Sequence, residues 1–183
     1  AGLWLRLHPE DVKGSPYRQW TFDSSISRMP EFIAPPVGKT SNTVTIKATL
    51  DENANGVLYA LGGSGGGLAC YMDDGHLCFE YNLMIVHRFV ARSKDKIQSG
   101  ARTIVVDTQL KAPKPGSPAD IVLSVDGTEV ARLSTMMTVP ALFTASESFD
   151  VGVDLGSAVA RDYFTRAPFR FSGTIDELRV QLK

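Results

Sequence analysis

The sequence has few cysteines, no long apolar run and no excess of either charge. Its 183 residues contain 2 cysteines, 19 basic residues and 20 acidic residues, and the net charge is -1. A nucleic-acid-binding protein usually carries a clear excess of positive charge, which this chain lacks. No apolar run approaches the roughly 18 residues that a membrane-spanning helix needs. We therefore expect neither nucleic acid nor a membrane as a partner.

Length and composition favour one folded domain. Hydrophobic residues make up 43% of the 183 residues, which is enough for a sizeable core in a single domain. The first stretch is mixed in character and ends in Gly14-Ser15-Pro16. We interpret residues 1–19 as a lead-in or linker segment and residues 20–183 as the domain.

Alternation of apolar and polar residues predicts strands along most of the chain. It is cleanest at 43–50 and in the C-terminal stretch 168–182, whose apolar positions begin with Phe169 and Phe171. Further candidates lie at 56–61, 68–72, 76–82, 88–92, 101–110, 120–125, 128–133 and 149–153. Helix is expected for a few turns at most, near 157–163. The pattern predicts an all-β fold with two stacked sheets.

The two cysteines flank a predicted hairpin turn at Asp73-Asp74-Gly75. A two-residue or four-residue loop pairs Cys70 with Phe79, and then the two sulfurs point to opposite faces of the sheet. A three-residue loop places Cys70 and Cys78 on one face, but diagonally, beyond comfortable disulfide reach. Either register predicts two small core thiols rather than a disulfide.

The motifs that commonly carry catalysis are missing or incomplete. The glycine run 62–67 has no G-x-G-x-x-G frame and precedes a predicted strand rather than a helix, so we interpret it as a flexible loop between strands with tight backbone approaches. Glu80 stands alone, and Asp176 and Glu177 are neighbours that face opposite sides of a strand, so no carboxylate pair of a glycosidase is evident. We expect no catalytic residues.

A cofactor is not expected either. The three histidines share no metal-ligand spacing. Asp150, Asp154 and Asp162 lie close enough in sequence to suggest a calcium loop. The alternative, which we favour, is that these carboxylates accept hydrogen bonds from backbone amides in turns. We therefore predict no metal site.

Two sets of residues are candidates for binding a ligand. Aromatic rings suit the flat faces of sugars, and the candidate rings are Trp20, Tyr71, Tyr81, Phe89 and Tyr163, with core packing as the alternative. Polar groups beside an apolar strand give a second set: Tyr81, Asn82, His87 and Arg88. Arg88 has the geometry to pair with a sulfate or a carboxylate, and its alternative is an ordinary surface arginine.

An ordered series of segments resembles one known family. The segments are Arg28 to Glu31 (RMPE), Ser41 to Ile46 (SNTVTI), Gly56 to Gly63 (GVLYALGG), Phe79 to Asn82 (FEYN), Phe149 to Ser157 (FDVGVDLGS) and Pro168 to Leu182 (PFRFSGTIDELRVQL). In this order they resemble the C-terminal sandwich domain of the large bacterial arylsulfatases, from about Trp20 to the end. The resemblance implies a two-sheet antiparallel jelly-roll sandwich of the concanavalin A-like lectin/glucanase and laminin-G type.

The departures from the family determine what the resemblance implies for function. The sulfatase nucleophile motif, Cys or Ser followed by x-Pro-Ser-Arg, is absent, because Cys70 is followed by Tyr71-Met72-Asp73 and Cys78 by Phe79-Glu80-Tyr81, with no proline at the second position. The resemblance thus implies a non-catalytic accessory domain that packs on the sulfatase catalytic domain of the same polypeptide. The alternatives are an independent carbohydrate-binding module, whose partner is a glycan, and a sandwich-fold glycoside hydrolase or lyase.

Overall fold

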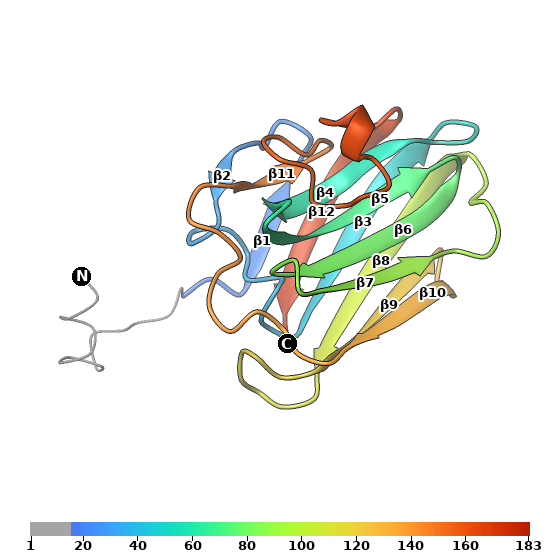
Figure 1. Cartoon of the computed structure of the whole chain (residues 1–183). Helices are drawn as coiled ribbons and strands as arrows, with labels where there is room; N and C mark the ends of the chain where they lie inside the picture. The colour runs from blue at the N-terminus through green and yellow to red at the C-terminus, as the bar shows by residue number, and fades with distance from the viewer. Residues whose placement is uncertain (1–15) are drawn as a thin grey trace, which may run out of the picture.

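The computed structural model describes residues 16–183, which form two stacked sheets of six strands each (Figure 1). The first sheet has the order β1 (Gln19–Phe22), β12 (Thr174–Leu182), β3 (Asn42–Leu50), β8 (Gly100–Leu110), β9 (Ala119–Val125) and β10 (Thr128–Thr135). The second has the order β2 (Met29–Pro30), β11 (Ser148–Val151), β4 (Gly56–Gly63), β5 (Gly66–Asp73), β6 (His76–Leu83) and β7 (His87–Arg92). Neighbouring strands pair antiparallel, for example β12 with β3 and β5 with β6. The predicted all-β, two-sheet antiparallel sandwich is confirmed.

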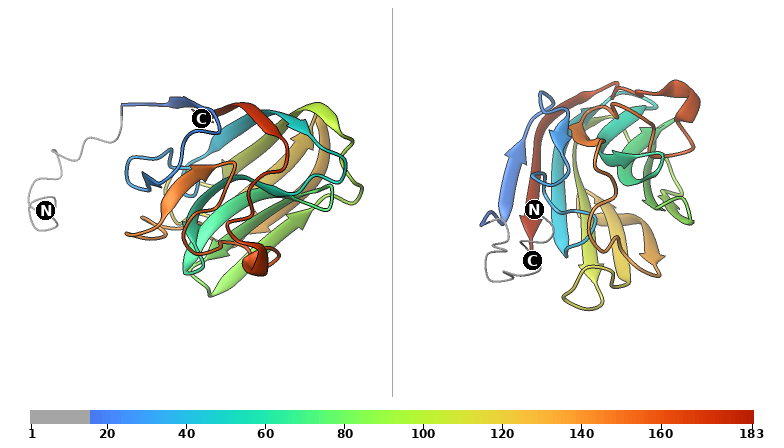
Figure 2. Two further views of the ribbon diagram at one scale, coloured as in Figure 1. Left: turned by 90° about the horizontal axis from the view of Figure 1, so that it is seen from above. Right: turned by 60° about the vertical axis from the view of Figure 1, so that its left-hand side comes forward.

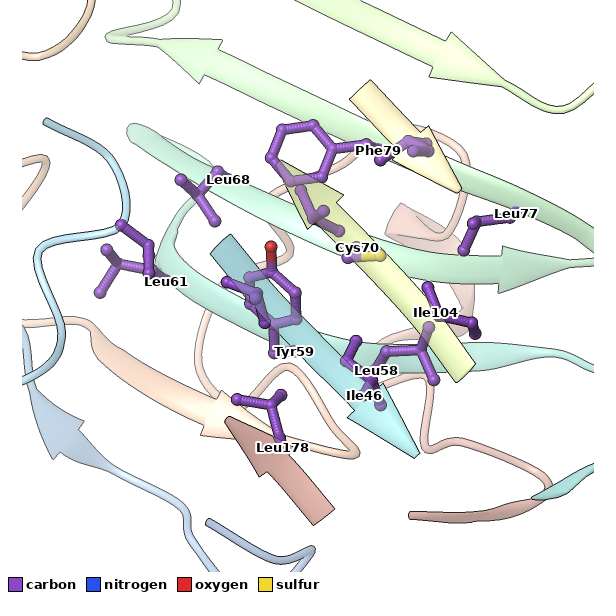
Figure 3. Close-up of a cluster of buried hydrophobic side chains, with 14 of the residues drawn as sticks. Ile46, Leu58, Tyr59, Leu61, Leu68, Cys70, Leu77, Phe79, Ile104 and Leu178 are labelled. Atoms are coloured by element: carbon purple, nitrogen blue, oxygen red, sulfur yellow. The ribbon is translucent and has the colours of Figure 1, made fainter. Parts of the chain in front are cut away.

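The two layers enclose one large core. Figure 2 shows β1, β12 and β3 in one layer and β4, β5 and β6 in the other. Along β3 every second side chain is buried, as strand periodicity requires. Ile46, Ile104 and Leu178 reach from the first sheet toward Leu58 and Phe79 of the second (Figure 3). All of these side chains are at most 1% exposed, so the close packing of the sheets is continuous here.

The predicted hairpin around the cysteines forms, and its turn has two residues, one of the three loop lengths considered. Asp74 and Gly75 have φ values of 46° and 81°, which is typical of the type I′ turn that suits twisted strands. Tyr71 pairs with Cys78 and Cys70 with Phe79, so the two thiols lie on opposite faces. Both cysteines are free and buried, and burial raises the pKa of each thiol. The prediction of two unbridged core thiols is confirmed.

The glycine run 62–67 is not the flexible loop that we expected. Gly62 and Gly63 end β4, Gly66 and Gly67 begin β5, and only Ser64-Gly65 forms the turn. A Cβ atom at Gly62 would lie 2.3 Å from the carbonyl oxygen of Gly66. The glycines therefore allow two backbones to approach closely, as expected, but the approach is made within paired strands rather than in a flexible loop.

Two further expectations along the chain are wrong. Residues 157–163 form bends rather than a helix, and the short 3-10 helix η2 (Phe164–Arg166) follows them. The C-terminal strand begins at Thr174 rather than at 168. Before it, the Phe169 carbonyl accepts the Val57 amide at the start of β4, and the Phe171 amide donates to the Gly152 carbonyl in a bend. In the described part of the chain, no helix is long and apolar enough to cross a membrane.

Residues 152–173 form a covering segment over the outer face of the second sheet, where Figure 1 shows them in orange and red across β4, β5 and β6. A second apolar cluster lies beneath this covering segment, built from Val57, Ala60, Ala69, Tyr71 and Cys78 of the sheet and Ala158, Val159, Ala160, Tyr163 and Phe169 of the segment. The Tyr163 ring stacks on Phe169 at 5.1 Å and meets Tyr71 edge-on at 5.1 Å. The cover explains why β4 is buried on both faces.

Residues 1–15 lie outside the described part, so the predicted lead-in is described only from residue 16 onward. Gln19 opens β1 and pairs with Gln181 of β12. The boundary between a lead-in segment at residues 1–19 and a domain at residues 20–183 stays a prediction.

Candidate functional site

The four residues predicted to contact a ligand occupy different surroundings. Tyr81 points into the core between the sheets, where its hydroxyl donates to the Gly38 carbonyl at 2.6 Å and accepts from the Val139 amide at 2.8 Å. Its neighbour Asn82 points to the outer face. His87 is exposed at the start of β7, with its ring 6.0 Å from that of Phe89. Tyr81 thus links the loops that contain Gly38 and Val139 to the core by hydrogen bonds.

The structure does bring Asn82 and Arg88 together. They are register partners on β6 and β7, and both donate to the Ser64 carbonyl, at 2.9 Å and 3.5 Å respectively. Arg88 also forms an ion pair with Glu80 and donates to the Val159 carbonyl at 2.9 Å. These hydrogen bonds are made inside the protein: those of Asn82 hold the turn between β4 and β5, and that of Arg88 to Val159 joins the sheet to the covering segment. A role for these residues in ligand binding stays a prediction.

The three aspartates considered for calcium accept hydrogen bonds within the fold. Asp150 accepts the Arg28 and Leu155 amides, and Asp154 accepts the Val159 amide. Asp162 accepts the Tyr71 hydroxyl at 2.8 Å. The expected bonding to backbone amides is therefore confirmed for the first two. Among residues 16–183, no group of three or more His, Cys, Asp or Glu side chains is arranged to hold a metal ion.

Asp154 makes the stability of the covering segment sensitive to pH. Burial raises its pKa from 3.8 to about 6, with the nearby carboxylates of Asp150 and Glu147 adding to the effect, although the Tyr163 hydroxyl donates to it at 2.6 Å. The folded protein therefore binds this proton more tightly than the unfolded chain does. Its stabilising effect is present at low pH and is lost as the pH rises through about 6.

We expect the free energy of unfolding to be about 1 kcal/mol higher at pH 5 than at pH 7 from this group alone. The measurement is urea denaturation at both pH values for the wild type and for Asp154→Asn, which keeps an oxygen for the two donors. The difference between the two proteins isolates Asp154. A variant that retains the full pH dependence of the wild type would contradict the assignment.

The exposed aromatic residues gather elsewhere, around the turn that follows β2. The side chain of Phe32 is 76% exposed, although a large apolar side chain on a domain surface costs solvation free energy. Phe32 lies between two surface hollows and lines both of them. The first, which Arg28 also lines and which we call the Arg28 hollow, measures about 330 Å³. The second, which Trp20 also lines and which we call the Trp20 hollow, measures about 310 Å³. We call the two together the side groove.

The Trp20 hollow is an aromatic surface. The rings of Tyr17 and Trp20 meet edge-on with centroids 6.5 Å apart. Phe32 also lines this hollow, and it comes from the turn after β2 rather than from a strand. Tyr17 is 66% exposed, and Trp20 is partly buried against the core. The remaining lining includes Glu31, Ala34, Pro36, Lys39, Thr40 and Leu182. Apolar rings with a few polar groups between them are typical of small-ligand sites.

The turn that presents Phe32 is fixed on both sides. The amides of Ile33 and Ala34 donate to the Pro30 carbonyl, each at 3.1 Å. The buried Glu31 carboxylate accepts the Phe143 amide at 2.9 Å and the Thr144 amide at 3.0 Å. Burial raises the pKa of Glu31, while these two amides act in the opposite direction. The exposed ring thus stands on a well-anchored turn.

Polar side chains line the Arg28 hollow. Arg28 is exposed, and among residues 16–183 its guanidinium has no carboxylate within ion-pair distance. Ser146, Glu147 and Ser148 contribute oxygen atoms, and Glu147 accepts the Ser157 hydroxyl at 2.7 Å. The groove therefore combines apolar rings with a cation and several hydroxyl groups, which suits a polar ligand that has apolar faces.

Sequence reasoning found one part of the side groove and missed the rest. Of the aromatic candidates, Trp20 lies in the groove, whereas Tyr71, Tyr81 and Tyr163 are buried and Phe89 is partly buried. Phe32 was missed because it lies in a short segment between prolines, where no periodicity separates an exposed ring from a buried one.

No protein-family model and no curated protein matches the chain. Solved structures share its fold. The Ruminococcus gnavus IT-sialidase CBM40 bound to α2,3-sialyllactose matches with a TM-score of 0.59 and 17% identity, over 89% of this chain and 90% of that one. Domains LG4-5 of the mouse laminin α1 chain match with a TM-score of 0.57 and 16% identity, over 93% and 40%.

The leech intramolecular trans-sialidase also matches, with a TM-score of 0.60 and 15% identity, over 89% of this chain and 25% of that one. These similarities show a concanavalin A-like and laminin-G-like sandwich. No comparison links the chain to arylsulfatases, and that part of the sequence resemblance stays a prediction.

Proposed function

We propose that the chain is a carbohydrate-binding module that holds its glycan in the side groove. The observation that carries the proposal is the exposed Phe32 ring, which is anchored by its neighbours between two hollows lined by Tyr17, Trp20 and polar side chains. Aromatic rings pack against the apolar faces of sugars, and hydroxyl and charged groups satisfy the sugar hydroxyls. The fold similarity to a carbohydrate-binding module of a sialidase supports this function.

The side groove gives this proposal a direct test. Phe32→Ala removes the shared ring, and because the ring is 76% exposed we expect the fold to persist. Binding to glycans identified on an array that includes sialyllactose should weaken about tenfold or more, measured by isothermal titration calorimetry.

The matched control is Phe164→Ala, which removes another exposed ring, 64% exposed, from η2 outside the groove. It should bind glycans like the wild type. A Phe32→Ala variant that binds as tightly as the wild type, or a wild type that binds no glycan on the array, would disprove the proposal.

A second candidate function is the accessory domain of a bacterial arylsulfatase. The ordered sequence resemblance supports it, and so does an apolar surface: Met84, Ile85 and Val86 in the β6–β7 turn are 45%, 62% and 73% exposed. Such a surface suits contact with a neighbouring domain. This function predicts a Cys/Ser-x-Pro-Ser-Arg segment upstream in the same reading frame and no aryl-sulfate hydrolysis by the chain itself. A complete reading frame without that segment would exclude it.

A further inference from the structure

A third hollow continues the side groove. It measures about 210 Å³ and shares Lys39 and Thr40 with the Trp20 hollow. Its other lining residues are Ser41, Leu110, Pro113, Lys114, Pro115 and Lys183. The Arg28, Trp20 and Lys114 hollows are therefore neighbours, and we call the three together the track; Phe32 lines the first two, and Lys39 lines the last two.

The added end of the track is positively charged. Lys39 donates to the Ala141 carbonyl at 2.7 Å, but among residues 16–183 neither it nor Lys114 has a carboxylate within ion-pair distance. Lys183 differs, because Asp107 pairs with it at 2.8 Å. The acidic side chains lining the track, Glu31 and Glu147, accept hydrogen bonds within the protein. Two ammonium groups thus remain for a ligand.

The loop that carries Lys114 has a fixed shape. Pro113, Pro115 and Pro118 restrict its backbone, and the Lys111 amide donates to the Pro118 carbonyl at 2.8 Å. The Gly116 amide donates to the Thr138 hydroxyl at 3.1 Å, which ties the loop to the segment after β10. The Lys114 ammonium therefore stands at the end of a constrained loop beside the groove.

We propose that the groove binds an anionic oligosaccharide, with sugar rings on Trp20 and Phe32 and a sulfate or carboxylate group between Lys39 and Lys114. This inference rests on the proposed carbohydrate-binding function and specifies its ligand class. Complementary charge at the basic end discriminates an acidic chain from a neutral one, since neither ammonium group lies within ion-pair distance of a carboxylate in the part of the chain that the structure describes.

Three probes of equal length test the inference by calorimetry: a heparin-derived hexasaccharide, an oligogalacturonate hexamer and the neutral maltohexaose. At least one anionic probe should bind about tenfold more tightly than maltohexaose, and its affinity should fall as NaCl rises from about 50 to about 500 mM. Tighter binding of the heparin fragment would mean that the site at Lys39 and Lys114 prefers a sulfate group. Equal binding of both acidic probes would mean that the site accepts sulfate and carboxylate groups alike.

The double variant Lys39→Gln with Lys114→Gln should weaken binding of the anionic probe about fivefold or more, and it should weaken binding of maltohexaose by less. Its control, Lys47→Gln with Lys94→Gln, removes the same charge at exposed positions outside the groove.

The inference is overturned if maltohexaose binds as tightly as both acidic probes, or if the two double variants behave alike. If Phe32→Ala still abolishes glycan binding in that case, the carbohydrate-binding function stands without the anionic ligand. If no glycan binds at all, both are disproved.

Discussion

Replacing Arg88 with alanine is expected to lower the free energy of unfolding by about 3 kcal/mol, because it leaves a buried carboxylate without its cation. The Glu80 side chain is 3% exposed and that of Arg88 is 16% exposed. Arg88 also donates to the Val159 carbonyl, and Glu80 accepts the Arg161 amide. The ion pair therefore connects β6 and β7 to the covering segment, and its loss releases both contacts.

Chemical denaturation of three variants measures this effect. Arg132→Ala is the control, since its ion pair with Glu129 lies on the surface, and we expect it to leave stability nearly unchanged. The double variant Glu80→Leu with Arg88→Met removes both charges while retaining bulk, and it should be more stable than Arg88→Ala. If Arg88→Ala is as stable as Arg132→Ala, the Arg88–Glu80 ion pair does not stabilise the contact between the second sheet and the covering segment.

The second large effect is expected at Gly62, where alanine should destabilise the fold by about 3 kcal/mol. The residue has a φ of 88°, a conformation that side chains with a Cβ rarely adopt. The added carbon would also meet the Gly66 carbonyl oxygen at 2.3 Å and the Gly67 Cα at 2.8 Å. Both obstacles are backbone atoms of the paired strand, so relief requires the hairpin itself to shift.

Gly65→Ala provides the control for this prediction within the same glycine run. Nothing lies within 4 Å of its Cβ position, and we expect a change of less than about 0.5 kcal/mol. Thermal and urea unfolding of the two variants compare them directly. Equal stability of the two would contradict the close strand pairing at Gly62 and favour the flexible loop that the composition suggested.

Local chemistry made part of the fold predictable. Asp73-Asp74-Gly75 identifies a turn, but three loop lengths fit it, and the structure selects the two-residue turn whose register separates Cys70 from Cys78. Alternation identifies β3 because one face of that strand is buried and the other is not. Where both faces are buried, as in β4, the run of apolar residues predicts a strand but not what covers it.

The remaining features depend on contacts between distant residues. The covering segment lies about 70 residues after Arg88 in sequence, so nothing beside Arg88 indicates that Val159 accepts its hydrogen bond. Trp20 was among the predicted aromatic residues, but its groove is completed by Phe32, Lys39 and Leu182. Only the folded chain brings these positions together. The sequence alone also does not indicate whether a single phenylalanine outside a periodic element is exposed to solvent or buried.

The anchoring of Glu31 has a consequence for the thermodynamics of recognition. Because its carboxylate holds the amides of Phe143 and Thr144, the turn carrying Phe32 and the loop opposite it form a single pre-organised support. A ligand that contacts this ring immobilises little backbone on arrival, so little conformational entropy opposes association. The entropy that opposes binding is then mainly that of the ligand itself, which loses translational, rotational and internal freedom.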